Sequence, residues 1–374
     1  MGIFAESLRQ IDTWVEEGAV KGVAAAVWHR GEIVDTLVAG DARPGEPVTN
    51  DTLFALASVT KPVTVATVMT FVDSGDIALD DPVASLLPAF GDELDPLDTD
   101  VLPQLEIHRD EITLRQILCH VSGLPENVSS DRLSMRNLPS LETLLDAMCR
   151  VPLQSAPGER LRYSNVGIGV AARLVEHLTG KPFAEVARER VIGPMNLPGI
   201  VSQPSGGDLA RIAHTDDPGN EGTPAESYNS AWWQDVAIPW GGYFGTATDL
   251  ATFAASFFPE QQNPLSPEVK SQMIIDQTGG VPGGVEIAGV YWHKGAWGLG
   301  WEVASTKRHH WTGTLRSPST FCHWGQAGTL VWADPERKLA LAVFGNRAVR
   351  VPWPLKPPRW SNLSNDLVTI ADQS

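Results

Sequence analysis

The chain has 374 residues, of which 43% are hydrophobic and 20% charged, with a formal net charge of -17. These values are typical of a globular protein with a large core, built as two or three domains or as one domain with an insertion. The acidic balance, with no lysine- and arginine-rich block, excludes nucleic acid as an expected partner.

The first twenty residues have neither a positively charged leader nor a long apolar run, so they do not predict a secretory signal. No stretch of about 18 or more uncharged apolar residues predicts a membrane span. We therefore expect a cytoplasmic protein without membrane association. The three cysteines, Cys119, Cys149 and Cys322, are too few for a disulfide framework, and we expect buried free thiols.

The amino-terminal region predicts a helix and then a β-hairpin. Residues 3–17 space their apolar side chains along one helical face. The stretch GVAAAVWHRGEIVDTLVAG predicts two strands joined by a turn at Arg30-Gly31. Helical and mixed segments follow from Thr60 to about Val290.

Strand character returns near the carboxyl end, in AWGLGWEVA, STFCHWGQAGTLVWADPE and KLALAVFGNR, with DPERK as a hairpin turn between the last two. A proline-rich extended stretch, VPWPLKPPRW, precedes a short helix in SNLSNDLVTIADQS. Strands at both ends and helices between them predict an α/β fold. Its sheet domain would comprise 1–60 and 291–374, split by a mostly helical insertion over 61–290, with the active site at their interface.

Ser58 and Lys61 lie three residues apart, just before the apolar run VTVATVMTFV. If a helix begins near Ser58, both side chains share one face, and the amine can accept the hydroxyl proton. This chemistry requires burial or a positive field to lower the pKa of the lysine. The alternative is an N-cap serine with an exposed lysine, because this spacing is common by chance.

Tyr163 and Asn165 are the second candidate pair, in PGERLRYSNVGIGV. A phenol can relay a proton between nucleophile and leaving group when a nearby ammonium lowers its pKa. The asparagine amide donates and accepts, so it can orient both the lysine and a substrate carbonyl. The alternative is a tyrosine packed at a loop and an asparagine that turns the chain.

The stretch HWGQAGTLVWADPE, from His323, is the third candidate. Gly325 lets a strand edge approach a ligand, and the N–H groups of Gln326 and Ser58 could form an oxyanion hole. His323 is a candidate to bind substrate or tune the tyrosine, and Trp324 a candidate wall of an apolar acyl pocket. The alternatives are an ordinary strand histidine and core packing.

The ordered motifs S-V-T-K, Y-S-N and H-W-G resemble the serine β-lactamase and penicillin-binding-protein superfamily, above all its class C branch and the family VIII carboxylesterases. TLRQILCHVSGLP and GGYFGTATDLATFA are similar to further blocks, and together the blocks cover most of residues 20–347. The resemblance implies an antiparallel sheet flanked by the N- and C-terminal helices, with a large, mostly helical inserted domain.

The resemblance also implies roles for the candidates. Ser58 would be the acylated nucleophile, and Lys61 and Tyr163 would share the acid/base work, with the identity of the base left open. Asn165 would orient substrate and lysine. The N–H groups of Ser58 and Gln326 would stabilise the oxyanion.

Two residues depart from the β-lactamase pattern of this branch, which usually has lysine and threonine where His323 and Trp324 stand. That lysine helps to bind the β-lactam carboxylate, whereas histidine is mostly neutral near pH 7. We therefore expect an intracellular carboxylesterase for small to medium acyl esters. A β-lactamase, a hydrolase of D-amino-acid amides or peptides, and a penicillin-binding sensor that stays acylated remain alternatives.

The adjacent histidines in RHHW, at 308–311, lack the spaced partners of a metal site. We expect no metal and no other cofactor. The expected partner is a small-molecule ester or amide, and the sequence does not predict an oligomeric state.

Overall fold

The structure is a computed structural model that describes residues 2–91, 109–129, 133, 135–217, 228–308, 310–349 and 353–374. The chain forms two compact units by its internal contacts. Unit 1 comprises Met1–Thr60, Ile192–Asn263 and Ala304–Ser374, and unit 2 comprises Lys61–Val191 and Pro264–Val303. The domain boundaries expected from the sequence stay a prediction, because these units are defined by contacts and not by independent folding.

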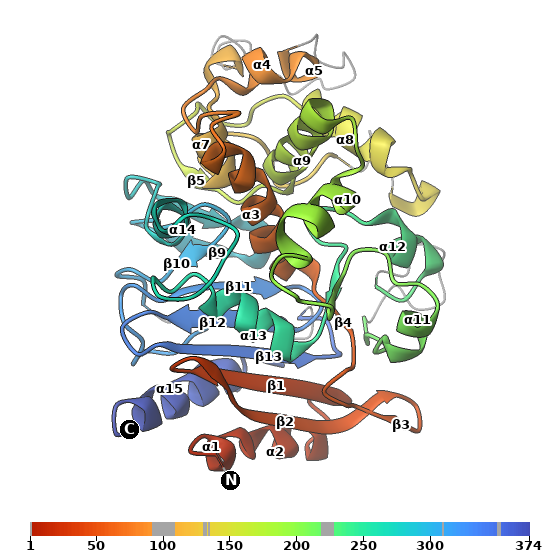
Figure 1. Cartoon of the computed structure of the whole chain (residues 1–374), viewed down its shortest axis with the longest axis vertical. Coiled ribbons are helices and arrows are strands. Elements are labelled where there is room, and N and C mark those ends of the chain that lie inside the picture. The colour runs from red at the N-terminus through yellow and green to blue at the C-terminus, as the bar shows by residue number, and fades with distance from the viewer. Residues whose placement is uncertain are drawn as a thin grey trace. The chain divides into compact units, whose positions relative to one another are not determined.

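Unit 1 contains an antiparallel sheet whose strands form in the expected places (Figure 1). The strands that unit 1 contributes are, in spatial order, β11 (Phe321–Gly325), β12 (Thr329–Asp334), β13 (Leu339–Gly345), β1 (Gly22–His29), β2 (Glu32–Arg43) and β3 (Glu46–Pro47). Strand β1 pairs with β13 from Val23, which lies opposite Gly345, to His29, which lies opposite Leu339. The expected hairpin and the strands expected in STFCHWGQAGTLVWADPE and KLALAVFGNR are confirmed.

Helices cover both faces of this sheet, as the complete burial of β1 and β13 requires. Near the two chain ends, α1, α2 and α15 pack against β1, β2 and β13, while α13 packs against β1, β12 and β13 (Figure 1). The bounds are α1 (Ala5–Leu8), α2 (Gln10–Glu16), α13 (Ala247–Ala255) and α15 (Arg359–Ala371). The flanking helices expected from the sequence are therefore confirmed.

Shorter elements complete unit 1. They are β4 (Phe54–Ala55), the 3₁₀-helix η1 (Ala57–Val59), β6 (Ile200–Val201), α11 (Gly207–Arg211), α12 (Ala231–Val236) and β7 (Phe244–Gly245). The strands β4, β7 and β6 form a small sheet of their own. Its strand β4 comes directly before η1 in the sequence, so this sheet fixes the place where that turn begins.

Unit 2 is mostly helical. Its helices are α3 (Thr60–Asp73), α4 (Val83–Leu86), α5 (Pro88–Gly91), η2 (Arg109–Glu111), α7 (Leu114–Leu118), η3 (Met135–Asn137), α8 (Leu141–Cys149), α9 (Asn165–Thr179), α10 (Phe183–Ala187), η4 (Arg188–Ile192) and α14 (Pro267–Ile274). Its remaining elements are β5 (Leu161–Arg162), β8 (Gly283–Val285), η5 (Glu286–Ala288), β9 (Val290–Trp292) and β10 (Glu302–Val303).

The expected strand in AWGLGWEVA is mostly wrong, since only Glu302–Val303 is extended. Gly300 has a φ of +78°, a left-handed conformation that interrupts a strand. A side chain there would also collide with Val65 of α3. The glycines of this stretch therefore serve close packing and not strand pairing.

The three cysteines are buried and free, as expected. No helix in the described part of the chain is both long and apolar enough to cross a membrane.

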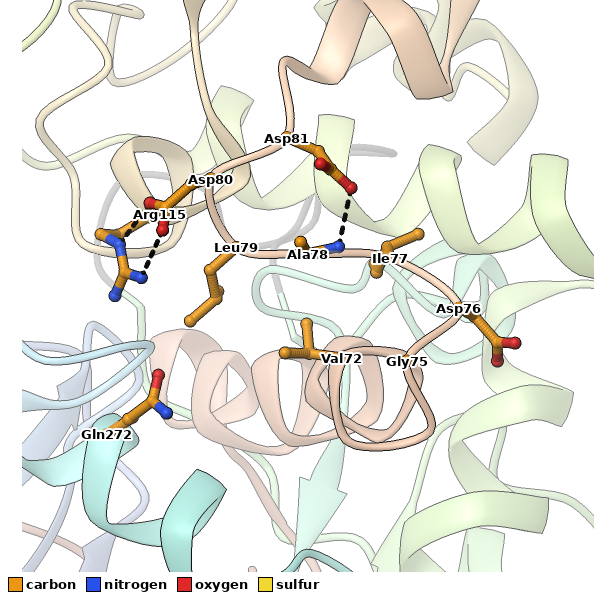
Figure 2. Close-up of a pocket in the computed structure, with 10 residues that line it drawn as sticks. All are labelled: Val72, Gly75, Asp76, Ile77, Ala78, Leu79, Asp80, Asp81, Arg115 and Gln272. Atoms are coloured by element: carbon orange, nitrogen blue, oxygen red, sulfur yellow. Dashed lines mark hydrogen bonds and ion pairs between the residues drawn. The ribbon is translucent and has the colours of Figure 1, made fainter.

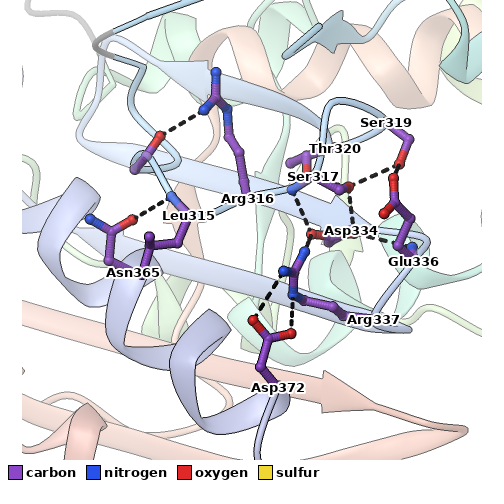
Figure 3. Close-up of polar contacts among 11 residues, drawn as sticks. Leu315, Arg316, Ser317, Ser319, Thr320, Asp334, Glu336, Arg337, Asn365 and Asp372 are labelled. Atoms are coloured by element: carbon purple, nitrogen blue, oxygen red, sulfur yellow. Dashed lines mark hydrogen bonds and ion pairs between the residues drawn. The ribbon is translucent and has the colours of Figure 1, made fainter.

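A buried carboxylate ties the β12–β13 turn to the rest of unit 1 (Figure 3). Asp334 accepts hydrogen bonds from the Ser317 N–H at 3.0 Å, the Ser317 hydroxyl at 2.7 Å and the Glu336 N–H at 3.1 Å. Arg337 donates to Asp334 at 2.9 Å and forms a two-pronged ion pair with Asp372 of the carboxyl-terminal region. Asp334 is fully buried, so its charge depends on these donors.

We expect Asp334→Ala to lower the free energy of unfolding by about 3 kcal/mol, because it leaves several buried donors and Arg337 without their acceptor. Thermal and urea unfolding would measure the loss. Asp372→Ala is the matched control, since it removes an exposed partner of the same arginine and should cost below about 1 kcal/mol. Equal losses in the two variants would contradict the assignment of Asp334 as the centre of this network.

Candidate active site

Ser58 lies in a tight turn at the start of a long buried helix. The turn is η1, and the chain continues from it directly into α3 at Thr60. Ala57 has a φ of +46°, an unfavourable left-handed conformation for a residue with a side chain. Ser58 is partly exposed although its neighbours Ala57 and Val59 are buried. The turn therefore presents the hydroxyl to a surface from an otherwise buried segment.

Two distant segments of unit 1 hold this turn in place. The Leu56 N–H donates to the Tyr243 carbonyl at 2.8 Å, and the Tyr243 N–H donates to the Thr60 hydroxyl at 3.2 Å. The Thr329 hydroxyl of β12 donates to the Leu56 carbonyl at 2.9 Å. These bonds fix the backbone on both sides of Ser58, which limits the motion of its side chain.

The end of β11 lies against the same turn, and Gly325 makes this approach possible. A methyl group at Gly325 would overlap the Leu56 carbonyl oxygen and lie 3.2 Å from the Ala57 Cβ. Gln326 follows, and its carbonyl accepts the Val349 N–H at 2.8 Å. Its own N–H has no acceptor among the described residues. A strand edge with a free N–H thus adjoins the turn that contains Ser58, as an oxyanion hole requires.

His323 and Trp324 occupy opposite faces of β11, because strand side chains alternate. His323 is buried, and its Nδ1 lies 2.9 Å from the Trp324 carbonyl oxygen. Since a carbonyl only accepts, Nδ1 carries the proton. Trp324 is half-buried and packs on Trp311, with ring centroids 5.3 Å apart. Substrate contacts by His323 and Trp324 stay predictions.

We expect Gly325→Ala to displace the Ser58 turn, because the added methyl meets backbone atoms that cannot move aside cheaply. Hydrolysis, measured as kcat/KM, should fall about 100-fold, with about 1–3 kcal/mol lost from stability. The matched control is Gly207→Ala on α11, where a methyl would meet nothing within 4 Å. A Gly325→Ala variant with unchanged kinetics would contradict the close packing described here.

Lys61 and Tyr163 come together in unit 2. Lys61 is fully buried, and its Nζ lies 4.8 Å from the centre of the Tyr163 ring. Burial lowers the pKa of Lys61 well below its ordinary value, and the charge of Glu126 offsets part of this effect. The alternative of an exposed lysine is therefore wrong. A buried amine with a lowered pKa is suited to accept a proton.

Backbone and ring contacts hold Tyr163. Its N–H donates to the Gly284 carbonyl at 3.1 Å, beside the short parallel pairing of β5 with β8. Its ring packs on His120, with centroids 4.7 Å apart, and on Trp297, with centroids 5.5 Å apart. The phenol is consequently oriented by an aromatic cluster and by main-chain hydrogen bonding.

His120 also fixes the backbone that follows Tyr163, a role that the sequence did not suggest. Its Nδ1 accepts the Ser164 N–H at 3.1 Å. The Ser164 hydroxyl donates to the Pro125 carbonyl at 2.6 Å and accepts the Gly167 N–H at 2.9 Å, which caps α9. The only sequence signal for His120 was its place before Ser-Gly-Leu-Pro in a block that resembles the superfamily.

Asn165 is the first residue of α9, and its side-chain oxygen is available as a hydrogen-bond acceptor. Its N–H donates to the Glu126 carbonyl at 2.9 Å, and its side-chain amide donates to Asn127 at 2.8 Å. Its buried Oδ1 has no donor among the described residues. This oxygen can therefore accept a hydrogen bond from an ammonium or from a substrate N–H.

The predicted site residues fall into two groups. In unit 1 the turn that contains Ser58 lies against Gly325, which Gln326 follows. In unit 2 Lys61 lies beside Tyr163, and Asn165 comes two residues after Tyr163 in the chain. The chain passes between the units after Thr60, within one continuous helical stretch that includes Ser58 and Lys61. A contact between Ser58 and Tyr163 stays a prediction.

A hollow of about 430 Å³ in unit 2 lies apart from these residues (Figure 2). Its lining includes Asp80, Asp81 and Arg115, none of which the sequence pointed to. The Arg115 guanidinium donates two hydrogen bonds to the Asp80 carboxylate, at 2.7 and 3.0 Å, and Asp81 accepts the Ala78 N–H at 2.7 Å. Because these polar groups satisfy one another, the hollow is not a candidate for the chemistry.

Comparisons with known proteins identify the family and the fold. A family model described as Beta-lactamase matches residues 8–360. Esterase EstB of Burkholderia gladioli is 32% identical over 204 residues, which are 50% of this chain and 48% of EstB. This chain spans about half the length of the first curated relatives that it matches.

Solved structures resemble the fold over nearly the whole chain. A penicillin-binding protein homologue from Caulobacter crescentus has a TM-score of 0.77 at 20% identity, covering 98% of this chain and 97% of its own. A family VIII carboxylesterase has a TM-score of 0.76 at 19% identity, covering 92% of both chains. This chain belongs to the β-lactamase family, whose fold is shared by hydrolases and penicillin-binding proteins.

Proposed function

We propose that the protein is a serine hydrolase that forms an acyl-enzyme and acts on carboxylic esters of small to medium acyl chains. The observation that carries the proposal is the buried Lys61 amine against the Tyr163 ring, three residues beyond a serine in a strained turn. A lowered lysine pKa supplies a base, and the turn supplies the nucleophile.

The reaction has two halves. The Ser58 oxygen attacks the ester carbonyl carbon while Lys61 or Tyr163 takes its proton, and the N–H groups of Ser58 and Gln326 stabilise the oxyanion. The ester C–O bond then breaks, and the departing alkoxide takes a proton from the same acid/base pair. Water next attacks the acyl-serine, which releases the carboxylic acid and restores the Ser58 hydroxyl.

Two features support esters above β-lactams. The third motif begins with His323, and an imidazole is not the permanent cation that a lysine would offer to a β-lactam carboxylate. The likeness to esterase EstB points the same way. Because Tyr163 beside an amine is also suited to protonate an amide leaving group, hydrolysis of β-lactams or of D-amino-acid amides and peptides is the second candidate.

The test compares p-nitrophenyl esters of increasing acyl length with nitrocefin and a D-alanyl peptide under identical conditions, with Ser58→Ala as the blank. We expect the highest kcat/KM for an ester. A higher value for nitrocefin or the peptide would reverse the ranking. Intact-mass measurement of a lasting β-lactam adduct without turnover would instead indicate a penicillin-binding sensor.

A further inference from the structure

We propose that Glu126 is a positioning residue that acts as the charge partner of Lys61, and that the turn η5 holds it in that role. The inference rests on the proposed function, in which Lys61 belongs to the catalytic pair. All the residues involved belong to unit 2. Glu126 follows the Ser-Gly-Leu-Pro segment and was not a candidate from the sequence.

The main chain fixes Glu126 beside the second motif. Its carbonyl accepts the Asn165 N–H at 2.9 Å, at the first residue of α9. The preceding Pro125 carbonyl accepts the Ser164 hydroxyl at 2.6 Å. Two consecutive carbonyls thus anchor the backbone of this loop at Glu126 to the segment that directly follows Tyr163.

The short segment from Gly284 to Ile287 contacts both the main chain of Tyr163 and the carboxylate of Glu126. The Gly284 carbonyl in β8 accepts the Tyr163 N–H at 3.1 Å, and three residues later the Ile287 N–H donates to the Glu126 carboxylate at 3.3 Å. The ion pair of Arg162 with Glu286, at 2.7 Å, fastens the intervening residue. The position of η5 therefore sets where the negative charge of Glu126 lies.

The charges around Lys61 make this placement matter. Burial favours the neutral amine, whereas the Glu126 anion favours the ammonium, and the two effects oppose each other in the pKa of Lys61. Burial raises the pKa of Glu126, while the Ile287 N–H, Lys61 and Arg162 lower it and Glu286 raises it. The balance between the free amine and the ammonium form of Lys61 hence depends on Glu126.

The first experiment follows Lys61 directly and needs no substrate. The protein is labelled with ¹³C-lysine, and the Cε–Hε signal of Lys61, assigned with Lys61→Met, is titrated in the wild type and in Glu126→Gln. Glutamine keeps an acceptor for the Ile287 N–H but removes the charge. We expect the Lys61 midpoint to move to lower pH, and an unchanged midpoint overturns the proposal.

The second experiment measures kcat/KM for a p-nitrophenyl ester across pH. Since the free base is required, the acid limb of the profile should shift to lower pH in Glu126→Gln and stay in place in Glu126→Asp. The control is Glu142→Gln on α8, which removes an equal charge from an exposed position outside the segments that hold Glu126 and Lys61, and should leave the limb unmoved. A uniform loss of kcat/KM without a shift would mean a structural role only.

The two experiments separate this inference from the proposed function. Absence of Ser58-dependent hydrolysis in the wild type would refute the function, while the titration of Lys61 would still decide whether Glu126 is its charge partner. Ser58-dependent hydrolysis with equal Lys61 midpoints in wild type and Glu126→Gln would refute the inference alone.

Discussion

Replacing Ser58 by alanine is expected to lower kcat for ester hydrolysis about 10⁴- to 10⁶-fold, because a methyl group cannot form the acyl-enzyme. The fold should be unaffected, since the turn is held by main-chain bonds of Leu56 and by Thr60 and Thr329, not by the Ser58 side chain alone. Initial rates with a p-nitrophenyl ester and unfolding curves would measure the two effects.

A chemical readout makes the Ser58 result independent of substrate choice. A fluorophosphonate should add one adduct to the wild type, mapped to Ser58 by peptide mass, and none to Ser58→Ala. The matched control is Ser7→Ala in α1, which should keep full activity and full labelling. Wild-type rates in Ser58→Ala would remove the assignment of the nucleophile.

Replacing Lys61 by methionine is expected to lower kcat about 10³- to 10⁴-fold, the contribution of a positioned acid/base group. Methionine has a similar shape and fills the buried space without a charge. The exposed Lys181 provides the matched control, because Lys181→Met should leave ester hydrolysis unchanged. Full activity in Lys61→Met would assign the base to Tyr163, with Tyr163→Phe then expected to show the loss.

The same variant should be more thermostable than the wild type, and the difference should depend on pH. The pKa of Lys61 is lower in the folded than in the unfolded protein, so folding below the folded-state pKa buries a charge. This penalty is complete at low pH and disappears as pH rises toward 10.5, the ordinary lysine value. The gain in Tm of Lys61→Met should accordingly be largest at acidic pH and shrink toward pH 10.5, which calorimetry would measure.

Sequence patterns were sufficient where structure depends on neighbouring residues. The hairpin turn at Arg30 and Gly31 has φ angles of +51° and +124°, which suit a two-residue connection between strands. The run from β11 to β13 followed from its β-branched residues and the DPERK turn. The S-x-x-K spacing likewise marked the start of a buried helix, because a long apolar run follows it.

Sequence patterns were insufficient where a role arises from contacts between distant segments. Glu126 is an isolated acidic residue in a loop, and only the fold brings the Ile287 N–H and Lys61 to it. His120 likewise gains its role from Ser164, 44 residues further along the chain. The alternation of β11 was readable, but the packing of Trp324 on Trp311 was not.

The burial of all three cysteines has a practical consequence for spectroscopy. Burial raises the pKa of Cys119 and Cys149 to about 12, so the reactive thiolate is scarce, and Cys322 is fully buried. Maleimides and spin labels should therefore leave the native protein unmodified. One cysteine engineered at an exposed position would give a uniquely labelled sample. With two such cysteines, the distance between the two labels could be measured without first removing the natural thiols.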